Sequence, residues 1–197
     1  KKIIGFYGVD NPPAESLDYV SDMLHIMGSF IVSSIRRRNL LRQLERMSYR
    51  DQLTQFGNRY AVDWFVEHEW NGEQIGVVYC DITGLKKVND EQGHEAGDRL
   101  IIRACECLAG VFKGYGLYRI GGDEFLVLCL GIEEKDLREH VEKLRMDMKE
   151  HQVTMAVGMI WKEHGPKDID LLLNESERLM YEDKDRYYKK HGLKRRR

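Results

Sequence analysis

The sequence predicts an α+β fold in which helices pack on a mostly antiparallel sheet. Short β-rich apolar runs alternate with longer amphipathic segments in the order βαββαβα. In the middle of that order, two apolar runs at 115–120 and 125–130 are separated by two glycines and two acids. Such a pair of runs predicts a β-hairpin, whose glycines would reach the positive φ that a tight turn demands.

The first 48 residues are predicted to form a strand and a long helix. Residues 3–9 read as a strand that ends at Asp10-Asn11-Pro12-Pro13. From Ser16 to Ser48 the apolar spacing is helical, with a register slip near the basic run Arg36–Arg38. This helix could pack on its own domain or pair with a second copy as a short coiled coil. Both can also be true, with one half of the helix packed on the domain and the other half paired.

A second domain is expected from about Asp51. Its predicted elements are a helix at 58–69, a strand at 75–82, a polar loop, a helix at 95–111, the hairpin, a helix at 133–151, a strand at 153–161 and a helix at 168–190. In a ferredoxin-like βαββ arrangement, strand 75–82 lies beside the hairpin.

Composition narrows the function. The 197 residues suffice for one domain and an appendage, and 42% hydrophobic with 32% charged residues describes a soluble globular protein. A net charge of −2 gives no basic field for nucleic acid, so the basic tail 192–197 reads as a solvated terminus. The apolar stretch 23–35 is too short and too polar to span a bilayer, so no membrane contact is expected. Four cysteines without metal-ligand spacing indicate a reducing, cytoplasmic compartment.

Three carboxylates are expected to converge at one end of the sheet. Asp81 closes the strand at 75–82, and Asp123 and Glu124 enter the second strand of the hairpin. Two such charges about 4 Å apart repel by roughly 4 kcal/mol at an effective dielectric near 20. A shared hard cation, Mg²⁺ above all, would relieve this repulsion. The alternative is that the acids only cap turns and helices.

The segment after Asp81 has the residue types of a nucleotide site. Gly84 allows close approach of the backbone to an anion, and Lys86 could contact a terminal phosphate. An Asn89 amide with an Asp98 carboxylate can read guanine, because the carboxylate accepts from groups that adenine lacks. Alternatively, Asn89 is a turn former and Asp98 a helix first-turn acid, while His94 is structural.

Three motifs occur in order and together resemble one family. They are Asp51-x-Leu-Thr-x-x-x-Asn-Arg59, Asp81-x4-Lys86-x2-Asn89-Asp90-x2-Gly93-His94-x2-Gly97-Asp98 and Gly121-Gly122-Asp123-Glu124-Phe125. Over about residues 51–190 the chain resembles the GGDEF-domain diguanylate cyclases, a family similar in fold to the polymerase palm. The resemblance implies condensation of two GTP into cyclic di-GMP, with release of two pyrophosphates, in a site that two domains share.

The resemblance also implies roles for individual residues. Asp81, the Ile82 carbonyl, Asp123 and Glu124 would ligate Mg²⁺ or Mn²⁺, which would activate a ribose 3′-hydroxyl. Asp123 and Glu124 are the catalytic candidates, with Asp123 as proton acceptor. The GTP-binding residues would be Asn89 and Asp98 at guanine, Lys86 and Lys184 at the phosphates, and Gly84, Leu85, His94, Gly121 and Gly122 around them.

Partners and domain limits follow from the same resemblance. A homodimer is implied through helix 15–48 and the active-site face, and residues 49–191 would form the catalytic domain. Residues 1–48 resemble the end of a GAF-type sensor that runs into a signalling helix, so we expect an upstream sensor and a longer protein.

The chain departs from the family pattern at three places. Gly84-Leu85 stands where two aromatics are usual, which leaves backbone contacts intact. Tyr188 replaces a phosphate-binding arginine, with Arg186 as a substitute, so GTP binding is expected to weaken. Phe112 and Tyr115 occupy the positions of the RxxD product-inhibition signature, so feedback should be absent. The alternative function is a catalytically degenerate domain that binds GTP or only dimerises; use of another nucleotide is disfavoured by Asn89 and Asp98.

Overall fold

The computed structural model describes residues 17–47, 49–166 and 168–192, together with Gly8, Asp10, Pro13 and Glu15. It divides into two units, residues 1–48 and residues 49–197. The predicted strand at 3–9 lies outside the described residues except for Gly8, and so does all of the basic tail except Gly192. Within the described ranges, no helix has both the length and the apolar character needed to cross a bilayer.

The first unit contains one long helix, α1 (Leu17–Met47), as the apolar spacing predicts. The helix continues through Arg36–Arg38, so the register slip of the sequence does not interrupt it. Large apolar side chains remain exposed along its length, at Leu17, Tyr19, Ile26, Met27, Phe30, Ile31, Val32, Leu40, Leu41 and Leu44. We refer to these ten residues together as the exposed apolar residues of α1.

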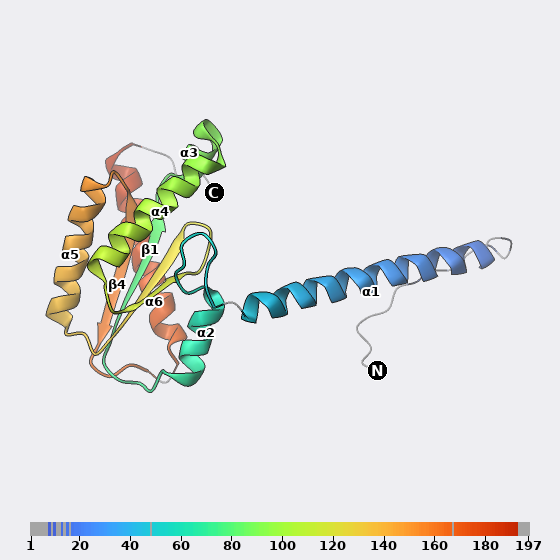
Figure 1. Ribbon diagram of the computed structural model, residues 1–197, viewed down its shortest axis with the longest axis horizontal. Coiled ribbons are helices and arrows are strands. Elements are labelled where there is room, and N and C mark those ends of the chain that lie inside the picture. The colour runs from blue at the N-terminus through green and yellow to red at the C-terminus, as the bar shows by residue number, and fades with distance from the viewer. Residues whose placement is uncertain are drawn as a thin grey trace. The chain divides into compact units, whose positions relative to one another are not determined.

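The second unit is a four-stranded antiparallel sheet with helices on both faces (Figure 1). Its strands are β1 (Ile75–Ile82), β2 (Gly116–Arg119), β3 (Glu124–Leu130) and β4 (Met155–Lys162). They lie in the order β2-β3-β1-β4, which is the ferredoxin-like order and confirms the predicted neighbours of β1. Every residue of β1 is buried because the strand is central and covered on both faces.

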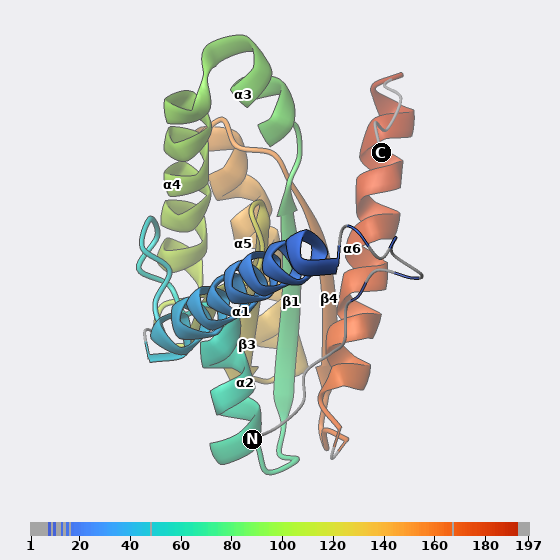
Figure 2. The same ribbon diagram turned by 90° about the vertical axis from the view of Figure 1, so that its right-hand side faces the viewer.

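The helices form two layers, and Figure 2 shows α6 and α4 on opposite sides of the sheet. Residues from α3 (Leu85–Gln92), α4 (His94–Val111) and α5 (Glu134–Glu150) share one apolar core with Val78, Cys80 and Ile82. Residues from α2 (Arg59–His68) and α6 (Asp170–Lys190) share the other with Val77 and Tyr79. The alternation of side chains along β1 therefore supplies both cores.

Two local features fix how helices meet the sheet. Asn58 caps α2, because its Oδ1 accepts a hydrogen bond from the Ala61 N–H at 3.1 Å. A Cβ at Gly158 would overlap the backbone of α6 at Ser176 and Met180, so glycine in β4 allows α6 to pack directly on the strand. The four cysteines are free and buried, as their spacing predicts.

The predicted polar loop after β1 is wrong in one respect. Residues 85–92 form the helix α3, which packs on α4. The segment has few apolar residues, and its helical character comes from two buried or half-buried side chains, Leu85 and Val88, that contact the core between α4 and the sheet. Tertiary packing therefore overrides the weak local pattern.

Candidate active site

The three acidic residues lie at one end of the sheet because β1 and β3 are neighbours in register. Asp81 and Glu124 are directly paired across the two strands. One residue further, the Ile82 N–H donates a hydrogen bond to the Asp123 carbonyl oxygen at 2.9 Å. The backbone pairing thus brings the ends of β1 and of the hairpin turn together, as the sequence predicts.

Electrostatic crowding is visible at Glu124. Burial, followed by the nearby charges of Asp123 and Asp81, raises the pKa of the Glu124 carboxyl above its usual value. The Lys184 ammonium partly opposes this shift. A cation placed among these acids would therefore be attracted, since the site carries unbalanced negative charge.

Lys184 already supplies one positive charge to the site. Its Nζ, on α6, donates to Asp81 Oδ1 at 2.6 Å and to Oδ2 at 2.8 Å. The side chains are 14% and 5% exposed, so the pair is largely screened from water. Sequence reasoning placed Lys184 at the phosphates of GTP and did not anticipate this contact.

The donor set suits a hard divalent ion. Carboxylate and carbonyl oxygens are the ligands that Mg²⁺ prefers, and Asp81, Asp123, Glu124 and the Ile82 carbonyl supply them. In the described part of the chain, no three acidic, histidine or cysteine side chains already converge as a metal cluster. Lys184 occupies the carboxylate of Asp81 instead, so an ion and this lysine would compete for the same oxygens.

The turn between β2 and β3 needs its glycine for space and not for φ. Neither Gly121 nor Gly122 has a positive φ, so that expectation was wrong. A Cβ at Gly121 would collide with Glu124 Oε2, which the glycine allows to fold back over the turn. Gly122 is open, and its carbonyl accepts a hydrogen bond from Arg119 Nη2 at 2.8 Å.

The candidate guanine residues lie on the two helices after β1. Gly84 begins α3 with a φ of 88°, a left-handed conformation that favours glycine. Asn89 Oδ1 is buried without a hydrogen-bond partner. A Cβ at Gly97 in α4 would collide with this oxygen, so Gly97 makes room for the Asn89 amide.

The other predicted GTP-binding residues of this region differ in exposure. Asp98, His94 and Lys86 are exposed and free to meet a ligand. Leu85 is buried in the core, so only its backbone could contact GTP. Asn89 and Asp98 thus lie on the neighbouring helices α3 and α4, and the buried Asn89 oxygen would gain from a hydrogen-bond donor.

Comparison with known proteins assigns the chain to a family. The family described as "Diguanylate cyclase, GGDEF domain" matches residues 48–190. The chain belongs to this family. The match begins at residue 48, and nothing in the comparisons supports the predicted GAF-like character of the residues before it.

Curated relatives agree with this assignment. MucR of Pseudomonas aeruginosa, a bifunctional diguanylate cyclase/cyclic di-GMP phosphodiesterase, is 29% identical over 80% of this chain and 25% of its own length. The Escherichia coli diguanylate cyclase DgcP is 26% identical over 82% of this chain and 54% of its own. The chain thus spans about a quarter to a half of these relatives.

A solved structure of the coiled coil and GGDEF domain of DgcB from Caulobacter crescentus, in complex with c-di-GMP, has a similar fold. Its TM-score is 0.62 at 20% identity, and the similarity covers 87% of this chain and 96% of that chain. At this level of identity the similarity shows the fold alone.

The departures from the GGDEF pattern have clear structural settings. Tyr188 is half-buried and packs edge-to-face on Tyr187, with ring centroids 5.8 Å apart. Arg186 is not a simple replacement, because it bonds Asp183 Oδ1 at 3.1 Å. At the position of the usual inhibitory signature, Phe112 and Tyr115 both pack against the His140 ring. Their ring centroids lie 5.6 and 6.1 Å from the centroid of that ring.

Two ion pairs that support the GGDEF site were missed by sequence reasoning. Arg119 Nη1 lies 3.1 Å from Asp51 Oδ1, so the Arg119 side chain joins the Asp51 motif to the Gly122 turn. On α6, Asp183 accepts from the Val157 N–H at 3.0 Å and from Arg145 at 3.3 Å, which fixes the residue beside Lys184. Asp51 and Arg119 are both visible next to motifs, but only the fold brings them together.

Proposed function

We propose that the chain is a diguanylate cyclase that condenses two GTP into cyclic di-GMP and releases two pyrophosphates. The observation that supports this most is the register pairing of Asp81 with Glu124 beside Asp123, in a domain of the GGDEF family. The unpaired Asn89 Oδ1 adds support, because a guanine amino group would satisfy it.

The protein's own groups would bind and orient the substrate. Asn89 and Asp98 hold the guanine, with His94 at the edge of the base site. Lys86 and Lys184 hold the β- and γ-phosphates, and the Gly84-Leu85 and Gly121-Gly122 backbones approach them closely. Lys184 must leave Asp81 to reach a phosphate, so substrate binding would free the Asp81 carboxylate.

Asp81, the Ile82 carbonyl, Asp123 and Glu124 would hold Mg²⁺, or Mn²⁺ in its place. The bound ion supplies Lewis acidity at the α-phosphate and at the attacking hydroxyl. Asp123 accepts the proton of the 3′-hydroxyl, the O3′–Pα bond forms, and the bond from Pα to the pyrophosphate oxygen breaks. The same step with the roles of the two nucleotides exchanged closes the ring and releases the second pyrophosphate.

Two copies of the chain are required, since each domain holds one GTP. We propose that they pair through the exposed apolar residues of α1 and through their active-site faces. The first contact is supported by the number of large apolar side chains that α1 leaves in water. We further propose an upstream sensor that controls this pairing, and a cytoplasmic location, where the buried free cysteines stay reduced.

A second candidate is a degenerate GGDEF domain that binds GTP or dimerises without turnover. Tyr188 in place of the phosphate-binding arginine favours it. The Lys184–Asp81 pair also favours it, because it fills the place where substrate and ion would act.

Incubation of the chain with GTP and Mg²⁺, followed by mass spectrometry, tests the proposal. We expect cyclic di-GMP and pyrophosphate, abolished by Asp123→Asn and unchanged by Asp136→Asn, an exposed acid on α5. The rate should stay constant as product accumulates, since Phe112 and Tyr115 replace the inhibitory signature. GTP binding without product in a confirmed dimer would establish the degenerate domain instead.

A further inference from the structure

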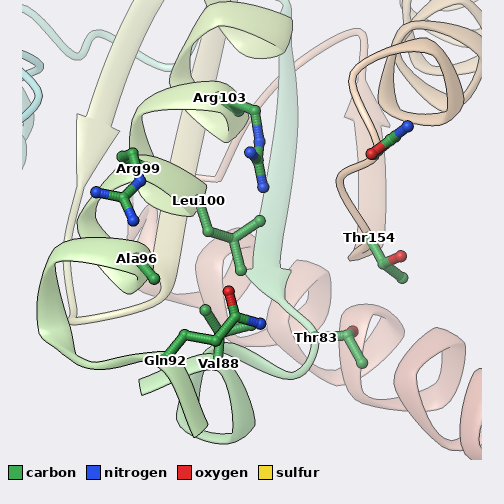
Figure 3. A pocket seen from close by; sticks show the side chains of 9 residues that line it. Thr83, Val88, Gln92, Ala96, Arg99, Leu100, Arg103 and Thr154 are labelled. Atoms are coloured by element: carbon green, nitrogen blue, oxygen red, sulfur yellow. The ribbon is translucent and has the colours of Figure 1, made fainter.

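A cavity of about 260 Å³ lies on the β4 side of the second unit. It opens between α3, α4 and the segment that joins α5 to β4 (Figure 3). Thr83, which lines it, donates its N–H to the Thr154 carbonyl at 2.8 Å. The cavity therefore lies where the end of β1 meets the start of β4. Asp81, Asn89 and Asp98 do not line it.

The cavity wall is positively charged. Arg99 and Arg103 of α4 line it, and no acidic residue does. Arg99 lies 4.0 Å from Glu95 on the same helix, whereas Arg103 makes no hydrogen bond or ion pair with any residue that the structure describes. Figure 3 shows the Arg103 guanidinium extending toward the space between Leu100 and Thr154, while Arg99 extends to the other side of the helix.

A buried hydroxyl distinguishes this cavity from a solvated arginine surface. Thr83 Oγ1 is inaccessible to water and has no hydrogen-bond partner, a state that costs free energy in a folded protein unless a ligand relieves it. Gln92, Gln152 and Thr154 add further donors to the lining. Gln152 has a φ of 54° because it is the left-handed residue that ends α5, where the Val153 N–H donates to the Met148 carbonyl at 2.9 Å.

The remaining wall is apolar. Val88, Ala96 and Leu100 form it, on the faces of α3 and α4 that meet. A cavity of about 150 Å³ can hold benzene, so about 260 Å³ holds a ring together with an attached anionic group. An apolar wall with a few convergent donors is the usual character of a small-molecule site.

We propose that this cavity binds a small organic anion, with its phosphate or carboxylate group on Arg103 and its apolar body against Leu100 and Val88. The planar guanidinium pairs with either group through two parallel hydrogen bonds. A small movement of the Thr83 side chain brings its buried hydroxyl, which has no other partner, to the same ligand. The site goes beyond the proposed cyclase reaction, and its occupancy does not depend on turnover.

Amide NMR titrations of the chain test the site with phenyl phosphate, benzoate and neutral benzyl alcohol. We expect saturable shifts at the Thr83, Gln152 and Thr154 amides with at least one of the two anions, and none at Gly121 and Gly122. The tighter of the two anions identifies phosphate or carboxylate as the preferred group. Binding of benzyl alcohol as tight as that of the anions would overturn the proposal, and so would shifts confined to Gly121 and Gly122 or no saturable shift.

Variants separate the cavity from a general surface effect. Arg103→Gln should weaken the anion by about tenfold or more, because it removes a charge-assisted pair. Thr83→Val should also weaken it while the melting temperature is kept or raised, since the unpaired hydroxyl disappears. Arg138→Gln, an exposed arginine on α5 outside the cavity, is the control and should change nothing. Equal affinities for the anion in Arg103→Gln and in the unchanged chain would contradict the proposal.

Discussion

Lys184 Nζ donates to both carboxylate oxygens of Asp81, at 2.6 and 2.8 Å. The contact joins α6 to the end of β1 in a setting where both side chains are mostly buried. A carboxylate in such a place is costly without a positive partner. Lys184 supplies that partner, and in the proposed reaction a metal ion and phosphate would take its place, which would connect the stability of the site to its occupancy.

Replacement of Lys184 should expose this connection. Lys184→Met removes the ammonium that pairs with the mostly buried Asp81 carboxylate, so the free energy of unfolding should fall by about 3 kcal/mol. Mg²⁺ should then stabilise the variant more than the unchanged chain, because the ion no longer competes with the Lys184 ammonium for Asp81. Urea denaturation with and without MgCl₂ measures both effects. Lys189→Met, an exposed lysine on the same helix, is the control, and equal Mg²⁺ effects in all three proteins would contradict the competition.

The ionised Glu124 carboxylate should destabilise the folded state at pH values above the usual pKa of a glutamate. Its pKa is raised in the folded state, mainly by burial and then by Asp123 and Asp81, so the folded protein binds this proton more tightly than the unfolded chain. Stability from this group is therefore present at low pH and lost as the pH rises through the folded pKa. Glu124→Gln should raise the melting temperature near pH 7, with a gain that disappears near pH 4. A gain independent of pH would show that charge is not its cause.

Asp51 should behave in the opposite way. Burial alone would raise the pKa of its carboxyl, but hydrogen bonds from Thr54 and the Arg119 ion pair outweigh burial and lower the pKa. Its contribution is present above the unfolded pKa and is lost as the pH falls through the folded pKa. Asp51→Asn should cost about 1–2 kcal/mol at pH 7 and little at pH 3, by denaturant titration at each pH. A constant cost at both pH values would count against the ion pair.

Gly97→Ala should separate stability from binding. Alanine is the better helix former, and the nearest atom in the way of its Cβ is the end of the flexible Asn89 side chain, so the stability of α4 should change little. The new Cβ would displace the Asn89 amide, and affinity for GTP should fall by about tenfold, as measured by calorimetry. Gly110→Ala, in the same helix, is the matched control: its Cβ would meet only Asp147 Oδ2 at an ordinary contact distance of 4.0 Å, so GTP affinity should be unchanged. Equal GTP affinities in the two variants would remove Asn89 from the guanine site.

Tyr188→Arg should strengthen GTP binding. The substitution restores the phosphate-binding arginine of the family pattern, and a guanidinium–phosphate pair should lower the KM for GTP by about fivefold to tenfold. Tyr187→Arg makes the same chemical change on the neighbouring residue, whose ring packs on His191 at 4.2 Å, and should give no gain. Steady-state kinetics compare the two, and an equal gain in both would indicate only a change in net charge.

Local patterns predicted most of the fold. Strand 75–82 was found at its predicted limits, and the apolar runs around Gly121 formed the predicted hairpin. The Asp81–Glu124 pairing followed from the same reasoning. In the hairpin β2 occupies one edge of β3, and the βαββ order places β1 at the other edge. Each of these features depends on the spacing of neighbouring residues, which a sequence displays directly.

Local patterns failed where packing or side-chain crowding decides the conformation. Residues 85–92 look like a polar loop, yet Leu85 and Val88 pack on the core and make them helical. Gly121 looks like a positive-φ residue, yet it is needed because Glu124 folds back over it. In both cases the cause is a contact that the local sequence does not show.

The sequence by itself identified the candidate site residues: Asp81, Asp123 and Glu124 at the sheet, and Asn89 and Asp98 after it. The tertiary structure decided that Lys184 neutralises Asp81, that Arg119 joins Asp51 to the Gly122 turn, and that Arg103 faces a cavity. The physical reason is chain distance: the Lys184–Asp81 partners are 103 residues apart, and Asp51 and Arg119 are 68 apart. Such contacts depend on how α6, α4 and the sheet pack together, and no periodic pattern encodes that packing.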